Sequence, residues 1–529
     1  MASFRTSLVV ALGLVIAGGV VSGQIGPSQA ELNGAAANTR DWLLSNHDYS
    51  GQRFVDLKII NRANVRSLRP VCIYQTGYTG PFPVHPVVYR GAMYLSAGPA
   101  TIAIDATTCQ RRWRHEWTPK AKQNFPMHRG VALKEGKVVR GTVDAYLIAL
   151  DAATGKVLWE TPAGDPEKGE SFTMPPLLFD DLVIIGAAGS ERGVRGWVGA
   201  FRLADGSPVW RFNTVPEPGE PGSETWSDIS NALVGGGATW TPFTLDVAKG
   251  LVFVAVANPA PDFFGEIRRG DNLYTSSVVV LDARTGKLQW YYQVVPHDLH
   301  DWDLTHASPL ISTIVNGARR DIVAAVGKDG LLHAIDRDTH QKLWDVPVTR
   351  RENAAAPVTV AGVRACPGVL GGVEWNGPAY HPQLNMLYTP AVDWCGTFSR
   401  AQEFAAGQGY MGGRYKGDPY DDARGLITAV DAGSGTLRWT YNSPQPLLAA
   451  ITTTSAGLLF TGELAGDFLV LDAQNGAELF RFETGAPNNG GVVTYAIDGR
   501  QYVALMSGDT SSLWPTPPAA GNVIIFGLP

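Results

Sequence analysis

Residues 150–159, LDAATGKVLW, contain the pattern that decides the fold of this chain. An apolar run leads into an aspartate, a polar turn with a glycine follows, and a tryptophan comes a few residues later. Aspartate followed by Thr-Gly is typical of a tight turn, because glycine supplies the positive φ that such a turn needs. We therefore expect a buried strand, a turn, and a returning strand that carries Trp159.

The same pattern recurs along most of the chain. The other copies are IDATTCQRRW (104–113), FRLADGSPVW (201–210), LDARTGKLQW (281–290), IDRDTHQKLW (335–344), VDAGSGTLRW (430–439) and LDAQNGAELF (471–480). A single small sheet leaves its apolar faces open, so such units must stack on one another, and repeats built only from strands are typical of propeller blades. Chance recurrence of a common hairpin turn is the alternative, and the number of copies argues against it. The sequence predicts an all-β propeller.

Composition agrees with this fold class. A chain of 529 residues would ordinarily form more than one domain, but a closed propeller grows by adding blades. The 60 glycines, 35 prolines and 15 tryptophans fit a turn-rich chain with one aromatic residue per blade. The formal net charge is −6 and no basic tract is present, which argues against nucleic-acid binding.

The N-terminus has the features of an export signal. Arg5 precedes an apolar run over 8–21, and small residues follow. Cleavage is expected after Gly23 or after Ala30, and Ser28-Gln29-Ala30 is the better match. A membrane anchor is the alternative, but the run is short for a span. We expect a signal peptide over 1–30, one propeller domain over 31–529, a periplasmic location and no stable membrane insertion.

The chain has four cysteines, an even number that suggests disulfides in an exported protein. Four cysteines allow three pairings. We favour Cys72–Cys109 and Cys366–Cys395 because these partners are nearest in sequence. None has the spacing of a zinc site, and no C-x-x-C-H haem motif is present.

The distances between the repeat tryptophans are uneven, and this indicates where chemistry lies. The intervals that contain 211–280 and 345–430 are much longer than the others. Extra residues in a propeller go into loops on one face, often the binding face. Residues 31–70 are polar and are expected to pack beside the ring as a lead-in.

Two glycine-rich stretches carry candidate binding residues. Glu191 lies in AAGSERGVRG (187–196), where small residues allow a ligand to approach the backbone closely. An ion pair with Arg192 or Arg195 is the alternative for this glutamate. Trp240 follows a triple glycine, so its ring could lie flat on a ligand, and Asn258 precedes a proline and could offer its oxygen to a hard metal ion. A packed tryptophan and a capping asparagine are the alternatives.

The stretch HDLHDWDL (297–304) is the most informative one, with three carboxylates and two imidazoles in seven residues. On a strand, Asp301 and Asp303 would face the same way. Two close carboxylates repel each other unless a cation lies between them. Zinc is not favoured, because neither an HExxH helix nor cysteine ligands accompany the stretch.

At this point a family resemblance becomes specific. The chain resembles the quinoprotein alcohol dehydrogenases, which use pyrroloquinoline quinone (PQQ), over nearly all of its mature length. The resemblance is carried by DWLLSNHDYSGQRF (41–54), the Asp-Gly-Trp repeats, GSERGVRG (189–196), GGGATW (235–240) with NPAP (258–261), HDLHDWD (297–303), GKDGLLHAIDR (327–337) and CPGVLGGVEWNGPAYHP (366–382). It implies an eight-bladed β-propeller with tryptophan-docking repeats and PQQ on its axis.

The resemblance also implies roles for individual residues. Asp301 matches the catalytic base of the family, and the metal ligands would be Glu191, Asn258 and Asp301, with Asp303 as an additional ligand. The residues that match PQQ contacts are Arg129, Thr173, Glu191, Trp240, Lys328, Asn376 and Trp514.

The implied reaction is oxidation of an alcohol to an aldehyde or ketone. A cation would polarise a quinone carbonyl, Asp301 would take the hydroxyl proton, and a hydride would pass to PQQ. Because no haem motif is present, electrons would leave to a separate periplasmic cytochrome c. Calcium is the expected ion, with a lanthanide as the alternative because Asp303 matches the extra aspartate of lanthanide-dependent relatives.

The chain also departs from the family pattern. Methanol dehydrogenase has two adjacent cysteines against the other face of PQQ, where this chain has Gln123 and Asn124. Phe125 or His128 would have to cover that face, which weakens methanol as the substrate. His300 stands where the family often has tryptophan.

Two other functions are weighed against this one. A PQQ-dependent sugar or polyol dehydrogenase would differ only in substrate. A non-catalytic propeller scaffold of the outer-membrane assembly type would explain the repeats and the export signal. It would leave the matches at Glu191, Trp240, Asn258 and Asp301 unexplained.

Overall fold

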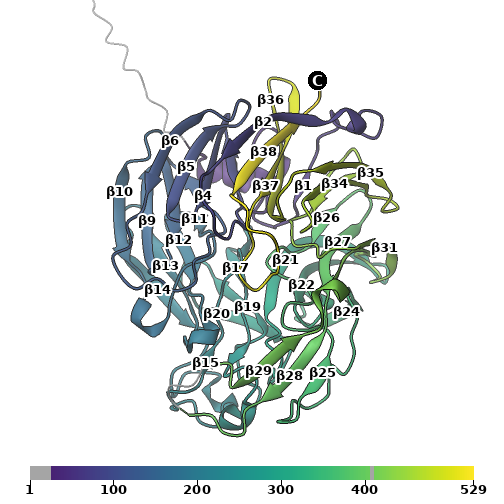
Figure 1. Cartoon of the computed structure of the whole chain (residues 1–529). Helices are drawn as coiled ribbons and strands as arrows, with labels where there is room; N and C mark the ends of the chain where they lie inside the picture. The colour runs from purple at the N-terminus through teal and green to yellow at the C-terminus, as the bar shows by residue number, and fades with distance from the viewer. Residues whose placement is uncertain (1–25, 406–409) are drawn as a thin grey trace, which may run out of the picture.

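The computed structural model describes residues 26–405 and 410–529, so most of the predicted signal peptide lies outside the described residues. The fold is a ring of eight antiparallel sheets, which confirms the all-β propeller and its predicted eight blades (Figure 1). Seven sheets have four strands and one has a fifth, β1.

Six blades are each built from consecutive parts of the chain. Their strands are β3 (Val87–Tyr89), β4 (Ala92–Ala97), β5 (Ala100–Asp105) and β6 (Arg111–Glu116); β7 (Ala132–Lys134), β8 (Lys137–Gly141), β9 (Tyr146–Asp151) and β10 (Val157–Pro162); β11 (Leu177–Phe179), β12 (Leu182–Gly186), β13 (Trp197–Arg202) and β14 (Pro208–Asn213); β16 (Thr244–Asp246), β17 (Leu251–Ala255), β19 (Ser277–Asp282) and β20 (Leu288–Gln293); β21 (Leu304–Val315), β22 (Ala318–Gly327), β23 (Leu331–Asp336) and β24 (Lys342–Pro347); β26 (Ala379–His381), β27 (Met386–Asp393), β30 (Arg424–Asp431) and β31 (Leu437–Ser443).

The last two blades recruit strands from the N-terminal part of the chain. The seventh contains β32 (Thr452–Thr454), β33 (Leu458–Gly462), β34 (Asp467–Asp472) and β35 (Glu478–Glu483), with β1 (Phe54–Val55) paired in parallel to β32. The eighth contains β36 (Asn488–Ile497), β37 (Arg500–Ser507) and β38 (Asn522–Gly527), with β2 (Arg69–Gln75) as its outer strand. Strands from both ends of the chain therefore close the ring, and closure leaves fewer free sheet edges.

The repeat tryptophans dock each blade onto the next. The indole nitrogen of Trp113 donates to the carbonyl of Ala152, 2.9 Å away, and a Cβ at Gly155 would lie 2.6 Å from the Trp113 ring. Gly155 has φ +72°, so both its backbone angle and the ring require glycine. The rings of Trp159, Trp210, Trp344 and Trp439 lie in the same way against Gly206, Gly286, Gly435 and Gly476 of the following turns.

A disulfide takes the place of this contact where the eighth blade meets the first. Cys72 directly follows the bulge in β2, as Trp159 follows the bulge in β10. Cys109 occupies the turn position of Gly155 and has φ +61°. The Cys72–Cys109 bond joins these two positions, with a Cα–Cα distance of 5.8 Å. The other disulfide is Cys366–Cys395, so both predicted pairings are confirmed.

The N-terminal segment packs against the ring more intimately than a surface lead-in. Arg53 is buried and donates to the carbonyls of Ile451 and Val492 at 2.7 and 2.9 Å. Helix α1 (Gln29–Asn33) is capped by Ser28, and the side-chain oxygen of Gln29 accepts a hydrogen bond from the Asp180 backbone N–H at 2.7 Å. Residues from 27 onward thus contact the propeller.

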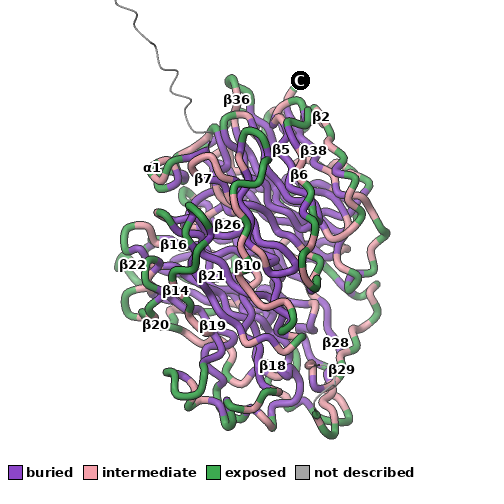
Figure 2. Tube along the Cα trace, turned by 90° about the vertical axis from the view of Figure 1, so that its left-hand side faces the viewer, coloured by how far each residue is buried: buried purple, intermediate pink, exposed green. Residues whose placement is uncertain are grey.

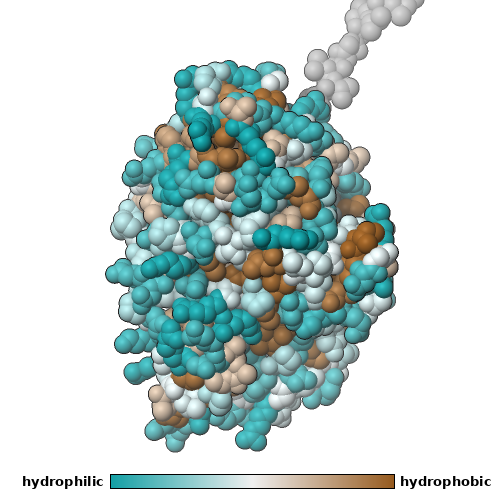
Figure 3. Space-filling model, turned by 90° about the vertical axis from the view of Figure 1, so that its right-hand side faces the viewer, coloured by the Kyte–Doolittle hydropathy of each residue, from teal (hydrophilic) through white to brown (hydrophobic). Residues whose placement is uncertain are grey.

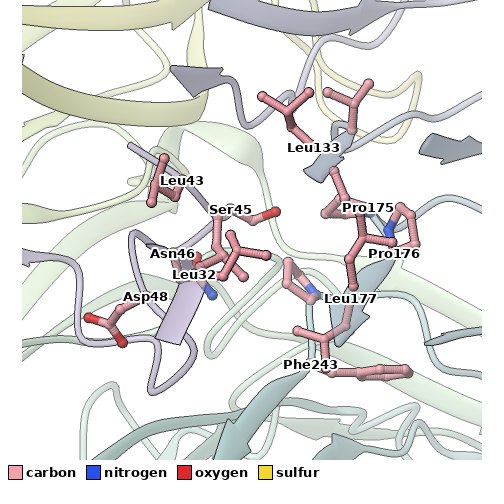
Figure 4. A pocket seen from close by; sticks show the side chains of 15 residues that line it. Leu32, Leu43, Ser45, Asn46, Asp48, Leu133, Pro175, Pro176, Leu177 and Phe243 are labelled. Carbon is pink, nitrogen blue, oxygen red and sulfur yellow. The ribbon is translucent and has the colours of Figure 1, made fainter. Parts of the chain in front are cut away.

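A small cavity of about 30 Å³ lies between this segment and the inner ends of the second and third blades (Figure 4). Its walls are mainly leucine, proline and Phe243, and Asp48 is the only ionisable residue among them. This composition is that of an imperfectly filled core, so we place no chemistry there.

The two long inter-tryptophan segments carry additional small elements. Strands β15 (Gly235–Gly236) and β18 (Pro259–Ala260) pair, and β25 (Val363–Ala365), β28 (Gly396–Arg400) and β29 (Gly413–Gly417) form a three-stranded sheet. Figures 1 and 2 place them together at one end of the molecule. The short 3₁₀ helices are η1 (Ala35–Ala37), η2 (Val65–Ser67), η3 (Pro166–Lys168), η4 (Ser190–Arg192), η5 (Ser223–Thr225), η6 (Gly265–Arg268) and η7 (Tyr420–Asp422).

Burial follows the blade architecture. The inner strands are buried and exposed residues gather at the turns and outer strands (Figure 2). The face in Figure 3 is mostly hydrophilic with small, separated apolar patches. Within the described part of the chain, no helix has the length and apolar character needed to cross a membrane.

Candidate active site

A cavity of about 120 Å³ lies where the inner ends of several blades and the two long segments meet. Its lining comes from parts of the chain far apart in sequence. The lining residues include Phe125, Met127, Arg129, Thr173, Ser190, Glu191, Trp240, Asp303, Lys328, Leu370, Glu374, Trp375, Leu513 and Trp514. Six of the seven predicted PQQ contacts are therefore brought together, and Asn376 is the exception.

Glycine residues allow the loop that carries Glu191 to approach its neighbours. Glu191 lies in η4, and β15 packs between this loop and β18. A Cβ atom at Gly235 would lie 2.8 Å from the Val194 carbonyl oxygen, and Gly236 has φ +93°. Side chains at these positions would push the loops apart. The sequence GGG thus allows the loop that carries Glu191 and the segment that carries Asn258 to pack closely together.

Aromatic rings and a buried guanidinium form one wall. The Arg129 guanidinium lies 4.7 Å from the centre of the Trp240 ring and 5.9 Å from that of Trp375. Trp375 and Trp514 meet edge to face at 6.4 Å. Burial lowers the pKa of Arg129 to about 10, which still leaves it charged at neutral pH. A planar anionic ligand would meet both a stacking surface and a positive charge here.

Below this wall, two carboxylates share one lysine. The Lys328 ammonium is 2.9 Å from Asp303 and 3.4 Å from Asp301, and all three side chains are buried. Burial alone would lower the pKa of Lys328, but Asp301 and Asp303 raise it well above its usual value. Burial also raises the pKa of Asp301, and this is only partly offset by Lys328. The cluster holds more negative than positive groups.

Unpaired polar atoms show where a ligand would fit. The side-chain oxygens Asn258 Oδ1, Asp301 Oδ1 and Thr173 Oγ1 and the nitrogen Arg129 Nε are buried without a hydrogen-bond partner. Buried polar atoms are normally paired, so this group requires a partner outside the protein. Oxygen donors fit a hard cation, and the donors beside Trp240 fit a polar planar cofactor. The residues present therefore fit both groups that the resemblance implies.

Desolvation and Asp303 raise the pKa of Glu191, which is partly exposed in the cavity wall. Among the described residues, Glu191 forms no ion pair with Arg192 or Arg195. Arg195 instead contacts the Ile229 carbonyl and Glu217. The alternative of a simple surface ion pair is thus not what the structure shows.

The conformation of 297–303 corrects one part of the sequence argument. These residues precede β21 and are not a strand, so alternation does not explain why Asp301 and Asp303 converge. Asp301 has φ +57°, a conformation that is costly outside glycine and that gathers at functional sites. Asp298 fixes the turn, because its carboxylate accepts the backbone N–H groups of His300 and Trp302 at 3.0 and 2.8 Å.

Two other sequence candidates lie elsewhere. The Asn376 amide donates to the Leu448 carbonyl at 2.6 Å and does not line the cavity. The His128 ring lies beside Arg140, 2.8 Å from its guanidinium, and is buried away from the cavity. Phe125 and Met127 line it instead. Of the two residues considered for the second cofactor face, only Phe125 lines the cavity.

Sequence reasoning missed Glu374, Trp375 and Asp262. Glu374 lines the cavity, and burial raises its pKa to about 7. Glu374 and Trp375 lie inside GGVEWNGP (371–378), a stretch already used for the resemblance, so their position beside Asn376 was the available signal. Asp262 follows a Pro-Ala-Pro sequence and has the appearance of an ordinary turn residue.

Comparison with known proteins agrees with this geometry. Residues 42–357 match the family model described as the glucose/ethanol/alcohol dehydrogenase β-propeller domain of PQQ enzymes. A shorter match, over 423–521, is to the model of the outer membrane protein assembly factor BamB. The chain belongs to the family of PQQ-dependent β-propeller alcohol dehydrogenases, which are oxidoreductases.

Individual relatives cover most of the chain. The quinohemoprotein alcohol dehydrogenase ADH IIB of Pseudomonas putida is 31% identical over 95% of this chain and 78% of its own. The lanthanide-dependent methanol dehydrogenase of Methylacidiphilum fumariolicum is 30% identical over 88% of this chain and 84% of its own. A europium-containing methanol dehydrogenase structure superposes with a TM-score of 0.85 at 26% identity, covering 94% of this chain and all of that one.

Proposed function

We propose that this protein is a periplasmic dehydrogenase that oxidises an alcohol to an aldehyde or ketone with metal-bound PQQ. One observation carries the proposal. The Lys328 ammonium, which contacts Asp301 and Asp303, lies 5.9 Å from the centre of the Trp240 ring, so the carboxylate cluster adjoins the aromatic wall. Family membership supports the reaction class, and the relatives supply the substrate class.

The residues that would hold the cofactor are Trp240, by stacking, Arg129 and Thr173, by their unpaired polar atoms, and Trp514 at the rim. Glu191, Asn258, Asp301 and Asp303 would hold a cation, either calcium or a lanthanide. When bound, metal-activated PQQ supplies the hydride acceptor.

Asp301 is proposed as the general base. Its unpaired Oδ1 is free to accept the proton of a substrate hydroxyl, while its Oδ2 faces Lys328 at 3.4 Å. Lys328 favours the ionised carboxylate that a base requires. Burial excludes water from the reacting groups, which strengthens these charge interactions.

Electrons would then leave to a separate cytochrome c. All four cysteines of the chain are in disulfides, so none is free to attach a haem. We expect the acceptor to be periplasmic, in agreement with the predicted export signal and with two disulfides.

Titration of the purified protein with PQQ, followed by quenching of tryptophan fluorescence, tests this function. The titration is done with calcium, with lanthanum and with chelator, and primary alcohols and glucose are then compared as substrates. Metal-dependent, one-to-one quenching with alcohol oxidation is the expected result. Oxidation of glucose but of no primary alcohol would favour a PQQ-dependent sugar or polyol dehydrogenase. Failure to bind PQQ under all three conditions would refute the enzyme and favour a scaffold.

A further inference from the structure

Asp262 is a buried carboxylate that the proposed chemistry leaves without a role. It follows β18 and its side chain is fully buried. Its Oδ1 accepts the Asn258 amide N–H at 3.0 Å, and its Oδ2 has no partner among the described residues. A buried carboxylate held by a single neutral hydrogen bond is costly to ionise unless another positive group is near.

The neighbouring cation meets this need only in part, because the charge of Arg268 lowers the pKa of the Asp262 carboxyl without forming an ion pair with it. Arg268 is buried nearby, but its donors go to the carbonyls of Pro261 and Asp298, at 3.0 and 2.6 Å, and to other backbone and amide oxygens. No ion pair joins Asp262 to a lysine, arginine or histidine within the part of the chain that the structure describes. The carboxylate is therefore available to a positive group from outside the chain.

Asn258 connects Asp262 to the proposed cation site. Its backbone N–H donates to Asp303 Oδ1 at 3.0 Å, and its side-chain N–H donates to Asp262. Because the amide nitrogen is turned toward Asp262, the amide oxygen faces away from it and is left unpaired. A carboxylate that holds the far side of a ligand fixes its orientation and raises the electron density on its donor atom.

Charge completes the argument. Burial raises the pKa of the Asp262 carboxyl, the charges of Glu191 and Asp303 raise it further, and Arg268 lowers it, so Asp262 is close enough to both acidic residues for their charges to interact. Asp301 and Asp303 both contact Lys328, and Asp303 also accepts the Asn258 backbone N–H, so the carboxylates near Asn258 outnumber the one lysine that contacts them. A site with this excess of negative charge gains more from an ion of higher charge.

We propose that Asp262 is a positioning residue of the cation site, which holds Asn258 through its amide and adds a negative charge that favours trivalent over divalent ions. This inference rests on the cation site of the proposed function. The inference goes beyond the proposed function because it assigns ion selectivity to Asp262, a carboxylate that need not contact the ion.

The test compares affinities for two ions in the full-length protein. Terbium binding is followed by luminescence excited through tryptophan, and calcium binding by displacement of terbium. Asp262→Asn keeps an oxygen that can accept the Asn258 N–H and removes only the charge. We expect the terbium-to-calcium affinity ratio to fall roughly ten- to hundredfold, as one unit charge acting on one extra ionic charge through protein implies. Asp262→Glu should restore most of the ratio.

A matched control is Asp144→Asn. Asp144 is also fully buried and accepts the Trp117 indole N–H at 2.9 Å, but it lies in the second blade away from the site. Its ratio should stay at the wild-type value. If Asp262→Asn lowers both affinities equally, or neither, the role of Asp262 is refuted while the cation site stands. Absence of terbium and calcium binding in the wild-type protein would refute the cation site and this inference with it.

Discussion

The Cys72–Cys109 disulfide joins the eighth blade to the first at the position where a tryptophan packs on a glycine between other blades. We predict that a tryptophan and a glycine at these two positions can replace the disulfide. The perturbation is Cys72→Trp with Cys109→Gly, which restores the sequence pattern of the other repeats. A ready acceptor exists, because the Tyr495 hydroxyl donates to the Ala106 carbonyl at 2.6 Å. The Ala152 carbonyl accepts in the same way from a tyrosine, Tyr94, and also from an indole.

The magnitude follows from chain entropy and burial. A disulfide with a sequence separation of 37 residues is worth about 4 kcal/mol in the loop-closure model. Docking a half-buried indole with one hydrogen bond contributes roughly 2–3 kcal/mol. Cys72→Ala with Cys109→Gly should therefore lose about 4 kcal/mol, and Cys72→Trp with Cys109→Gly should recover more than half. At about 2.1 cal/mol/K per residue, this corresponds to roughly 4 °C lost and 2–3 °C regained.

Differential scanning calorimetry of the three proteins without reductant gives these values. The Cys72→Ala, Cys109→Gly protein is the matched control, because it has the same glycine and lacks only the indole. If the tryptophan variant is no more stable than the control, Cys72 and Cys109 are not equivalent to the tryptophan and glycine of the other blades.

Three further outcomes are expected. Asp301→Asn should lower turnover by about 10²–10⁴-fold with PQQ quenching unchanged, and near-normal turnover would exclude Asp301 as the base. Glu374 has a pKa of about 7 in the folded protein against 4.5 ordinarily, so the folded state binds more protons between these values and unfolding free energy should fall by about 3 kcal/mol as pH rises across them in chelated protein. Chemical denaturation should show this fall, and Glu374→Gln should reduce it by the Glu374 contribution, while the raised pKa values of Asp262, Asp298 and Asp301 keep their own contributions. A fall of the same size in the variant would contradict this prediction. Mass spectrometry of the exported protein should place the cleavage after Gly23 and not after Ala30, because Gln29 contacts the ring. A fully stable protein that starts at residue 31 would refute this prediction.

The fold could be predicted because the repeat combines several local signals. The Asp turn, the glycine at positive φ and the tryptophan each act within about ten residues, and their recurrence indicates stacked blades. The substitution at the ring closure could not be seen in this way. Cys72 has no turn beside it, and its partner position is defined only when β2 pairs with β38.

The candidate site was less accessible from sequence. Glu191, Trp240 and Asn258 were visible in glycine- and proline-rich stretches, but only the resemblance assigned them to one place. The convergence of Asp301 and Asp303 was expected for the wrong reason, since Asp301 is at positive φ and not in a strand. Asp262 and Glu374 have no acidic neighbours in sequence that would mark them as site residues. Their chemistry comes from burial, and burial is a property of the assembled ring.

The excess of buried carboxylates links binding, pH and stability in this site. Burial raises the pKa of Asp262, Asp301 and Glu374, so without a cation these groups tend to hold protons. A bound cation would favour their ionised forms and release those protons. Cation affinity should therefore increase with pH over the range in which the folded protein without cation becomes less stable. The same charges that weaken the folded protein in the absence of the ion would hold the ion in place, and Asp301 would become an ionised base as a consequence of binding.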